Sequence, residues 1–232
     1  MFDIQTPFGC GFGFSVKTFN DYNMLALDPQ EILLLSPNVV EKRKIEFCLG
    51  RVAAHSALEQ INIRNIPVLK GKYNEPLWPP EVVGAISHSN KIAIAVATSK
   101  SKAAGIGIDI EIIDDEISNE LIKQICTVTE ANWVNDSKMH KLERLLMIFS
   151  AKESILKSFF PITNKFFGFL DAELVWDKDT GTFLGTLIKN IGRGYNIGYI
   201  FTVGCRIIGR YVFTYMKLPS VDTNLGNLQT IE

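Results

Sequence analysis

The chain has 232 residues, of which 47% are hydrophobic, and its formal net charge is −1. This length allows a globular core in one large domain or two small lobes, and the near-neutral charge argues against a general nucleic-acid-binding protein. No apolar run approaches the ~18 residues that a membrane span needs, and the first residues lack the basic and apolar regions of a signal peptide.

Cysteine and histidine spacing gives little support for a zinc site. The four cysteines contain no CxxC pair, and the three histidines lie far apart in the sequence. Scattered cysteines of this kind favour reduced thiols in a cytoplasmic protein.

The first half of the chain is expected to contain three strands and one long helix. The strand-like runs lie at residues 12–18, 83–88 and 91–98. An amphipathic helix is predicted from Glu41 to about Ile63. The segment from Lys70 to Pro80 is rich in proline and glycine, so no regular element is expected there.

The second half begins with a strand at residues 105–111, turns helical and then returns to strands. Helices are predicted at residues 118–126, 129–135, 138–149 and 151–159. The later strands are predicted near residues 168–176, 181–187, 196–204 and 207–217.

This order of elements predicts an α+β fold made of two similar lobes with a pseudo-twofold relationship. Each lobe would hold a small, mostly antiparallel sheet with helices, and the cleft between the lobes would hold the active site. The N-terminal lobe is expected at residues 1–104 and the C-terminal lobe at 105–217. Residues 218–232 are polar and are expected to form a flexible tail.

Two acidic segments are the most informative feature of the chain. In the first, isoleucine alternates with Gly, Asp and Glu, so Asp109 and Glu111 would lie on one side of a strand. In the second, Glu153 and Lys157 are four residues apart and would share one face of a helix. Mg²⁺ binds a few carboxylates together with substrate phosphates. The pattern therefore suggests metal-dependent chemistry on a pyrophosphate, with the lysine neutralising phosphate charge.

Each of these residues also has a simpler interpretation. Asp109 and Glu111 could form the solvated face of a half-buried strand. Ser150 and Glu153 fit a capping box at a helix start. Glu153 and Lys157 have the favoured orientation of a surface ion pair, which is worth only ~0.3–0.5 kcal/mol. Spacing alone leaves these alternatives open.

A set of basic and polar residues in the first half could bind phosphate. Arg43 and Arg51 are eight residues apart, about two helical turns, so both would project from one side of their helix. Arginine suits bidentate phosphate binding. The other members of the set are Lys70, Lys72, Ser87 and His88. The alternative is a solvated helix face and a structural histidine.

In this order, these pieces resemble the 4′-phosphopantetheinyl transferases of the larger, monomeric kind, including enzymes that serve siderophore, nonribosomal-peptide and polyketide synthases. The resemblance covers about residues 40–217. The matching motifs are Arg43-x-x-Glu46-Phe47-x-x-x-Arg51, the segment from Lys70-Gly71 to Glu75-Pro76-Leu77-Trp78-Pro79, Ile86-Ser87-His88-Ser89, Gly107-Ile108-Asp109-Ile110-Glu111, Phe149-Ser150-Ala151-Lys152-Glu153-Ser154-Ile155-Leu156-Lys157, and Phe159-Phe160-Pro161 followed by Gly168-Phe169-x-Asp171-Ala172. The two acidic motifs in tandem are specific, so the metal interpretation is preferred to the surface ion pair.

The resemblance implies transfer of the 4′-phosphopantetheine arm of coenzyme A to a serine of an acyl or peptidyl carrier protein. Adenosine 3′,5′-bisphosphate would be released. Mg²⁺, or alternatively Mn²⁺, would be held by Asp109, Glu111 and Glu153. The residues expected to hold coenzyme A are Arg43, Arg51, Lys70, Lys72, Ser87 and His88. The enzyme is expected to act in the cytoplasm as a monomer, with neither nucleic acid nor membrane as a partner.

Two glutamates are candidates for the base that activates the carrier serine. Glu153 would act directly or through water, and Glu130 matches a family glutamate proposed for the same role or for a metal-bound water. A base is assigned by geometry before pKa, so both remain candidates at this point. Lys157 would stabilise the transferring phosphate and could protonate the leaving oxygen.

Two other classes of function remain as alternatives. One is a Mg²⁺-dependent phosphohydrolase acting on coenzyme A or a nucleotide, and the other is a non-catalytic coenzyme A-binding module. The presence of all four residues Asp109, Glu111, Glu153 and Lys157 favours the transferase. One departure from the family pattern is Glu75, which stands where some members have a lysine. A phosphate contact from this loop would therefore come from Lys70 or Lys72.

Overall fold

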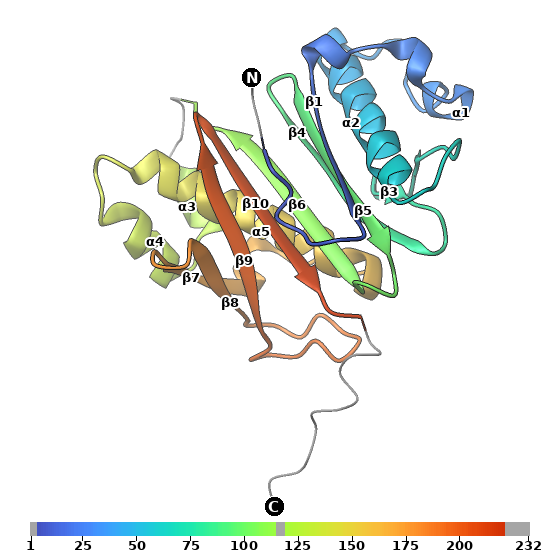
Figure 1. Cartoon of the computed structure of the whole chain (residues 1–232). Coiled ribbons are helices and arrows are strands. Elements are labelled where there is room, and N and C mark those ends of the chain that lie inside the picture. Colours follow the sequence, from blue (N-terminus) through green and yellow to red (C-terminus); the bar gives the residue numbers. More distant parts are fainter. Residues whose placement is uncertain (1–3, 115–118, 221–232) are drawn as a thin grey trace, which may run out of the picture. The chain divides into compact units, whose positions relative to one another are not determined.

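The computed structural model describes residues 4–114 and 119–220 and divides into two compact units. Unit 1 comprises the described parts of Met1–Ile106 and Lys217–Glu232, and unit 2 comprises those of Gly107–Met216. Each unit combines strands with helices, and the sheets are built from antiparallel pairs (Figure 1). The predicted α+β class is therefore confirmed.

Unit 1 is a three-stranded sheet packed against one long helix. The strand order is β1-β5-β4, and the helix α2 packs against all three strands (Figure 1). Their bounds are β1 (Phe12–Thr18), α2 (Glu41–Gln60), β4 (Val82–Ser89) and β5 (Ile92–Ser99). The smaller elements are η1 (Phe19–Asp21), η2 (Met24–Ala26), α1 (Pro29–Ile32), β2 (Leu69–Lys70) and β3 (Pro76–Leu77).

Small residues bring α2 close to the sheet of unit 1. Ala53, Ala54 and Ala57 are fully buried on the helix face that meets the sheet. A Cβ on Gly13 of β1 would overlap the carbonyl oxygen of Ala57. This helix–strand distance therefore requires glycine on the strand and alanine on the helix.

The β4–β5 hairpin places its turn close to where the sequence predicts it. Asn90 and Lys91 form the two-residue turn, and both have positive φ, 42° and 64°. Positive φ at both central residues is the requirement of a type I′ turn, whose twist matches that of the strands. Asparagine tolerates this conformation well.

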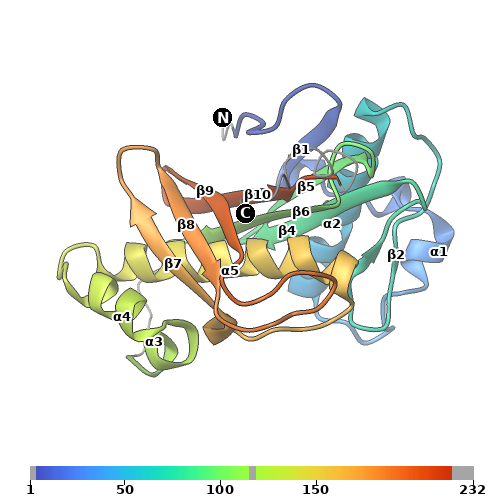
Figure 2. The same cartoon turned by 90° about the horizontal axis from the view of Figure 1, so that it is seen from below.

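Unit 2 is built around a long helix beside a twisted sheet. The strand order is β6-β10-β9-β8-β7, and Figure 2 shows α5 running along the sheet with α3 and α4 beside it. The bounds are β6 (Gly105–Ile112), α3 (Asn119–Ile125), α4 (Val128–Asn135), α5 (Lys141–Thr163), η3 (Phe169–Asp171), β7 (Ala172–Asp177), β8 (Thr182–Leu187), β9 (Ile200–Ile208) and β10 (Tyr211–Leu218).

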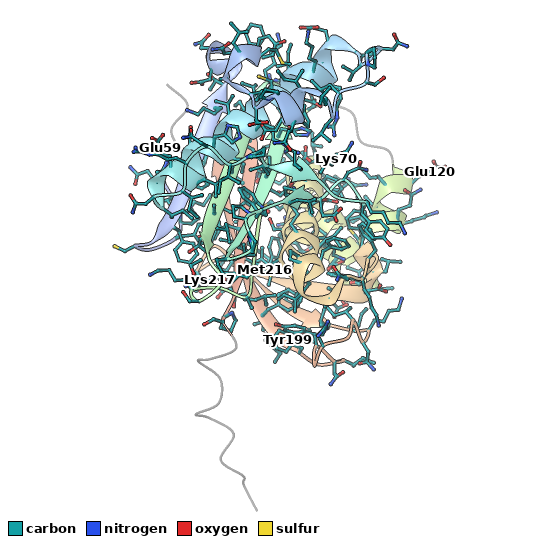
Figure 3. The ribbon with its side chains drawn as sticks, turned by 90° about the vertical axis from the view of Figure 1, so that its right-hand side faces the viewer. Glu59, Lys70, Glu120, Tyr199, Met216 and Lys217 are labelled. Carbon is teal, nitrogen blue, oxygen red and sulfur yellow. The ribbon has the colours of Figure 1, made fainter. Side chains whose placement is uncertain are left out.

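An aromatic cluster fixes the C-terminal end of α5 in unit 2. The ring of Phe159, which is fully buried, lies at the centre of this cluster. Its centroid is 4.9–6.2 Å from those of Phe167, Tyr195, Tyr199 and Phe201. Tyr199, labelled in Figure 3, belongs to the segment that leads into β9. Edge-to-face aromatic pairs of this kind add to the energy of apolar burial.

The second half differs from the sequence prediction in its long helix. The two helices predicted at 138–149 and 151–159 are one continuous helix, α5. Ser150 lies inside it and does not cap a helix start, so the capping-box interpretation was wrong. The helix ends at Asn164, whose left-handed backbone (φ 50°) forms the C-cap.

Two further predictions were wrong, one of an irregular segment and one of the start of a strand. Residues 70–80 were expected to lack regular structure, yet β2 and β3 pair as a short antiparallel hairpin. The strand predicted at 196–204 begins only at Ile200, because Gly192, Gly194 and Gly198 have positive φ and hold the preceding segment as a loop.

Leu218 is the last residue of β10 and is buried, whereas residues 221–232 of the predicted tail lie outside the described residues. None of the helices in the described ranges is both long and apolar enough to cross a membrane.

Candidate functional site

Asp109 is a buried carboxylate within the edge strand β6 of unit 2. Its neighbours Ile108 and Ile110 are fully buried, and Asp109 itself is 2% exposed. The solvated-face interpretation is therefore wrong for Asp109. A buried carboxylate needs a cation or several donors to remain charged, and the ammonium of Lys157 on α5 lies 2.6 Å from its Oδ1 atom.

The backbone of α5 can approach β6 closely because Gly107 has no side chain. A Cβ on Gly107 would overlap the carbonyl oxygen of Ser154. Two residues beyond Gly107 is Asp109, and next to Ser154 is Glu153. This close approach therefore brings the two predicted acidic segments together.

A buried hydroxyl network fixes α5 against β10. The hydroxyl of Thr214 lies 2.9 Å from that of Ser150 and 2.7 Å from that of Ser154. It also donates to the carbonyl oxygen of Ser150 at 2.8 Å. All three side chains are fully buried. The network holds the helix that carries Glu153 and Lys157 in one register.

Glu153 is half-buried and lies within electrostatic range of both Asp109 and Lys157. Burial raises the pKa of the Glu153 carboxyl, the Lys157 ammonium lowers it and the Asp109 carboxylate raises it, and the net shift is upward. Glu111 is half-buried two residues beyond Asp109 on β6, so it lies on the same side of the strand. A carboxylate with a raised pKa holds a proton more readily than an exposed one, as a general base must after it has acted.

The donor set has the chemistry that a divalent cation prefers, since all its ligands would be carboxylate oxygens. Within residues 4–114 and 119–220, however, no group of three or more His, Cys, Asp or Glu side chains is close enough to hold a metal ion. Protein ligands of Mg²⁺ are usually one or two carboxylates, and substrate phosphates and water complete the shell. The residues present fit that mode of binding, and the metal site stays a prediction.

Glu130 occupies a different and fully buried environment. Its side chain is 1% exposed, and its Oε2 atom lies 2.6 Å from the ammonium of Lys152. The amide of Thr127 also donates to Oε2, at 2.7 Å, and that of Leu174 donates to Oε1 at 2.8 Å. Lys152 further donates to the carbonyl oxygens of Ile125 and Phe169. With both oxygens occupied, Glu130 is placed to tie α4 to α5 and β7.

The predicted phosphate-binding residues meet in unit 1. Arg43, Arg51, Lys70 and His88 line one pocket of about 300 Å³, together with Glu46 and Phe47. We call this the arginine pocket. Lys70, labelled in Figure 3, comes from the β2–β3 hairpin, the arginines come from α2, and His88 comes from β4.

Arg43 and Arg51 differ in their surroundings. The Nη1 atom of Arg43 is 3.1 Å from Nε2 of His88 and 3.5 Å from a carboxylate oxygen of Glu46. Arg51 is 6% exposed, and its guanidinium stands 4.5 Å from the centroid of the Phe47 ring. Burial lowers the pKa of Arg51 to about 10.

Arg51 is only partly hydrogen-bonded within its own unit. Nη2 donates to the carbonyl oxygen of Leu69 at 3.4 Å. Nε is buried and has no hydrogen-bond partner among the described residues. A buried donor without a partner is costly, and an anion in the pocket would supply one.

Two predicted coenzyme A contacts do not line the arginine pocket. The ammonium of Lys72 lies 5.4 Å from the ring centroid of Tyr73, and Ser87 is buried within β4. Glu75, the departure from the family pattern, accepts a hydrogen bond from the amide of Tyr73 at 2.8 Å and folds over Gly71. It therefore shapes the hairpin turn.

Sequence reasoning missed three residues of these sites: Glu46, Phe47 and Lys152. Glu46 and Phe47 stand inside the motif that was recognised for its arginines, so their place one turn from Arg43 and Arg51 was a usable signal. Lys152 precedes Glu153 directly, and adjacent residues on a helix point about 100° apart. That offset explains why Lys152 meets Glu130 while Glu153 lies near Asp109.

Two family models match the chain. The model of the 4′-phosphopantetheinyl transferase N-terminal domain matches residues 29–98, and that of the 4′-phosphopantetheinyl transferase superfamily matches residues 105–215. The two matches fall on the halves that carry the arginine pocket and the Asp109–Lys157 pair.

Several named proteins are similar in sequence. The 4′-phosphopantetheinyl transferase PptT of Mycobacterium tuberculosis is 31% identical over 163 residues, which is 70% of this chain and 71% of that protein. The 4′-phosphopantetheinyl transferase Npt of Nocardia iowensis is 31% identical over 160 residues, covering 68% and 70%. Enterobactin synthase component D of Escherichia coli O157:H7 is 37% identical over 138 residues, covering 59% and 64%.

Proposed function

Because the chain belongs to the 4′-phosphopantetheinyl transferase superfamily, we propose that it moves the 4′-phosphopantetheine arm of coenzyme A onto a serine of an acyl or peptidyl carrier protein. The serine oxygen attacks the phosphorus that bears the arm, and the bond to the leaving phosphate breaks. The second product is adenosine 3′,5′-bisphosphate. The proposed setting is the cytoplasm, with the chain acting as a monomer.

One observation carries this proposal: the ion pair of Asp109 with Lys157, and the electrostatic coupling of both to Glu153. The two carboxylates and the ammonium group lie on a strand and a facing helix. Together they can bind and orient a phosphate group and take the proton from the hydroxyl that attacks it. These groups are held by the Gly107–Ser154 contact and the Thr214 network, so they are preorganised for that task.

The divalent cation, for which Mg²⁺ is proposed and Mn²⁺ is the alternative, would be held by carboxylates drawn from Asp109, Glu111 and Glu153, with phosphate and water oxygens completing its shell. When bound, the cation would neutralise negative charge on the pyrophosphate. Lys157 would then exchange its contact with Asp109 for the transferring phosphate, because its flexible stem lets the ammonium follow the negative charge.

We assign the base to Glu153 in preference to Glu130. Burial raises the pKa of both carboxyls, so the pKa does not separate the two candidates, whereas Glu153 lies within electrostatic range of Lys157 and Asp109. Glu130 is enclosed by three nitrogen donors, including the ammonium of Lys152. A base must lie within hydrogen-bond reach of the proton that it takes, and a carboxylate with both oxygens occupied meets that condition poorly.

The arginine pocket is the proposed site for a phosphate of coenzyme A. Arg43, Arg51, Lys70 and His88 supply its donors. The Nε of Arg51 finds no hydrogen-bond partner in the part of the chain that the structure describes, which favours an anionic ligand. Lys72 and Ser87 remain proposed contacts for the rest of the nucleotide.

The direct test is intact-mass spectrometry of an apo carrier protein incubated with the enzyme, coenzyme A and MgCl₂. We expect a mass gain of one phosphopantetheine arm, loss of the gain in EDTA and its return with excess Mg²⁺. An assay of adenosine 3′,5′-bisphosphate checks the second product. Cleavage of coenzyme A without a mass gain would indicate a phosphohydrolase instead. Binding of coenzyme A without either reaction would indicate a non-catalytic module.

A further inference from the structure

Glu46 is a carboxylate inside a pocket that otherwise collects cations. It stands on α2 one turn after Arg43 and lines the arginine pocket with Arg43, Arg51, Lys70 and His88. Its side chain is 14% exposed. A negative charge in this position repels a phosphate, so its presence in a phosphate-binding pocket calls for a compensating role.

The contacts of Glu46 suggest what that role is. One of its carboxylate oxygens, Oε2, lies 3.5 Å from Nη1 of Arg43 and 3.8 Å from Nδ1 of His88. The same Nη1 atom lies 3.1 Å from Nε2 of His88. The three side chains therefore form a closed triangle that joins α2 to β4.

The triangle also defines the tautomer of His88. Arginine has only donors, so Nε2 of His88 must accept the hydrogen bond from Arg43. The proton of the neutral ring then sits on Nδ1, which faces the carboxylate of Glu46. Without that carboxylate only the contact with Arg43 would favour the Nδ1–H form, and the triangle would no longer hold the Arg43 side chain beside the ring.

We propose that Glu46 is a positioning residue of the arginine pocket, which holds Arg43 and the Nδ1–H tautomer of His88 in place for a phosphate of coenzyme A. This inference rests on the proposed function of the pocket. Glu46 itself does not contact the phosphate. Glu46 repels the ligand, but it also holds Arg43 in place before binding. The ligand then need not meet the cost of ordering a long arginine side chain, and this gain outweighs the repulsion.

A repelling role and a positioning role of Glu46 predict opposite changes in ligand affinity when the carboxylate is removed, which makes the proposal testable. A carboxylate that only repelled phosphate would weaken binding, so Glu46→Ala would tighten it. A positioning carboxylate strengthens binding, so Glu46→Ala weakens it. Glu46→Gln separates charge from position, because the amide oxygen can still accept from Arg43 and face the Nδ1 side of the His88 ring without carrying a charge.

The experiment is isothermal titration calorimetry of the full chain with coenzyme A and, separately, with adenosine 3′,5′-bisphosphate. The variants are Glu46→Ala, Glu46→Gln and the control Glu59→Ala, which removes an exposed carboxylate near the C-terminal end of α2 (Figure 3). Thermal melts report whether each variant is folded. Nitrogen-15 spectra of the histidine rings report the tautomer of His88, which a merely structural role would leave unchanged.

We expect Glu46→Ala to raise Kd for both ligands at least tenfold and to disturb the Nδ1–H signal of His88. Glu46→Gln should recover binding to within about threefold, and Glu59→Ala should match the wild type. In transfer assays Glu46→Ala should raise KM for coenzyme A and leave kcat nearly unchanged, as expected for lost binding contacts.

Equal or tighter binding by folded Glu46→Ala would overturn the positioning role while leaving the proposed function intact. Failure of the wild type to bind either ligand would overturn both. An unchanged His88 spectrum in Glu46→Ala would show that the carboxylate does not set the tautomer and would also refute the proposal.

Discussion

Gly107 of β6 lies against the backbone carbonyl of Ser154 on α5 so closely that a Cβ at Gly107 would overlap the carbonyl oxygen. Both residues adjoin the proposed reacting groups, since Asp109 follows Gly107 by two residues and Glu153 precedes Ser154. The separation of strand and helix at this point therefore sets the distance between the two carboxylates. Backbone packing, rather than direct bonding between the acids, assembles this part of the site.

Gly107→Ala is expected to push α5 away from β6. Overpacking of a tight interior typically costs ~1–3 kcal/mol, and here the obstacle is backbone, which cannot turn aside. We expect that loss in the free energy of unfolding, measured in urea, and at least a hundredfold fall in kcat for transfer. Gly9→Ala is the matched control, because Gly9 has open space around its Cβ position. Wild-type turnover by Gly107→Ala would contradict this role of the contact.

The two candidate bases can be separated by neutral substitutions of equal size. Glu153→Gln should lower kcat by ~10²–10⁴, the range that general base catalysis contributes. Glu130→Gln should lower kcat less than tenfold, because its carboxylate is enclosed by Lys152 and two amides. Single-turnover transfer at saturating coenzyme A measures both. The reverse order of effects in folded variants would reassign the base to Glu130.

The Glu130–Lys152 pair should matter chiefly to stability. Lys152→Met leaves the carboxylate of Glu130 buried without its cation, and breaking one side of such a pair costs ~3–5 kcal/mol. The double variant Lys152→Met/Glu130→Gln removes both charges and should regain a large part of that loss. Urea unfolding of the wild type and the three variants completes the cycle. Additive losses in the double variant would show that the two side chains do not interact.

The acidic part of the site could be predicted from sequence because its spacing follows regular periods. Alternation on β6 predicts Asp109 and Glu111 on one side of the strand, and the i, i+4 spacing on α5 predicts Glu153 and Lys157 on one face of the helix. The ion pair of Lys157 is with Asp109 across the strand–helix contact, which spacing within α5 does not report. The role of Glu130 could not be read in the same way. Its environment depends on Lys152 and on the amide of Leu174, which are 22 and 44 residues away, and no local pattern encodes such a distant contact.

The boundaries of α5 and β9 also could not be predicted from local sequence spacing. Ser150 and Glu153 matched a helix start, but tertiary packing keeps the helix continuous because the Ser150 hydroxyl bonds to Thr214 on β10. The start of β9 was predicted four residues early, because the positive φ of Gly198 breaks the strand pattern just before Ile200. In both places a contact or backbone conformation that spacing does not report decided the boundary.

Glu31 provides a pH-dependent test of unit 1. Its carboxylate is fully buried and accepts from Nε2 of His55 at 2.8 Å and from the amide of Val68 at 2.7 Å. Burial alone would raise the pKa of Glu31, but these hydrogen bonds and the charge of His55 bring it below its ordinary value of 4.5. A lowered pKa in the folded state means that the unfolded chain binds the proton more tightly, so this stabilisation is present above about pH 4.5 and is lost as pH falls through the folded-state pKa.

The variant that reports this effect is Glu31→Gln. At pH 7 it should unfold more easily than the wild type by ~1–3 kcal/mol, because hydrogen bonds to a charged acceptor are lost. The difference between the two proteins should shrink as the pH is lowered below 4.5. Urea unfolding at pH 7, 5 and 4 measures it. A difference that grows in acid would mean that the pKa of Glu31 is raised in the folded state.

Arg51 should show opposite effects on stability and on ligand binding. Its guanidinium is buried against Phe47, its Nε has no hydrogen-bond partner among the described residues, and burial lowers its pKa to about 10. A methionine has a similar length without the charge, so Arg51→Met should be about 1 kcal/mol more stable than the wild type. The same change removes a phosphate donor and should raise KM for coenzyme A at least tenfold with a smaller effect on kcat. Thermal melts and transfer kinetics on one preparation test the expected gain in stability and the expected rise in KM. If Arg51→Met bound coenzyme A as the wild type does, the arginine pocket would not be a phosphate site, and a loss of stability would show that the buried cation supports the fold.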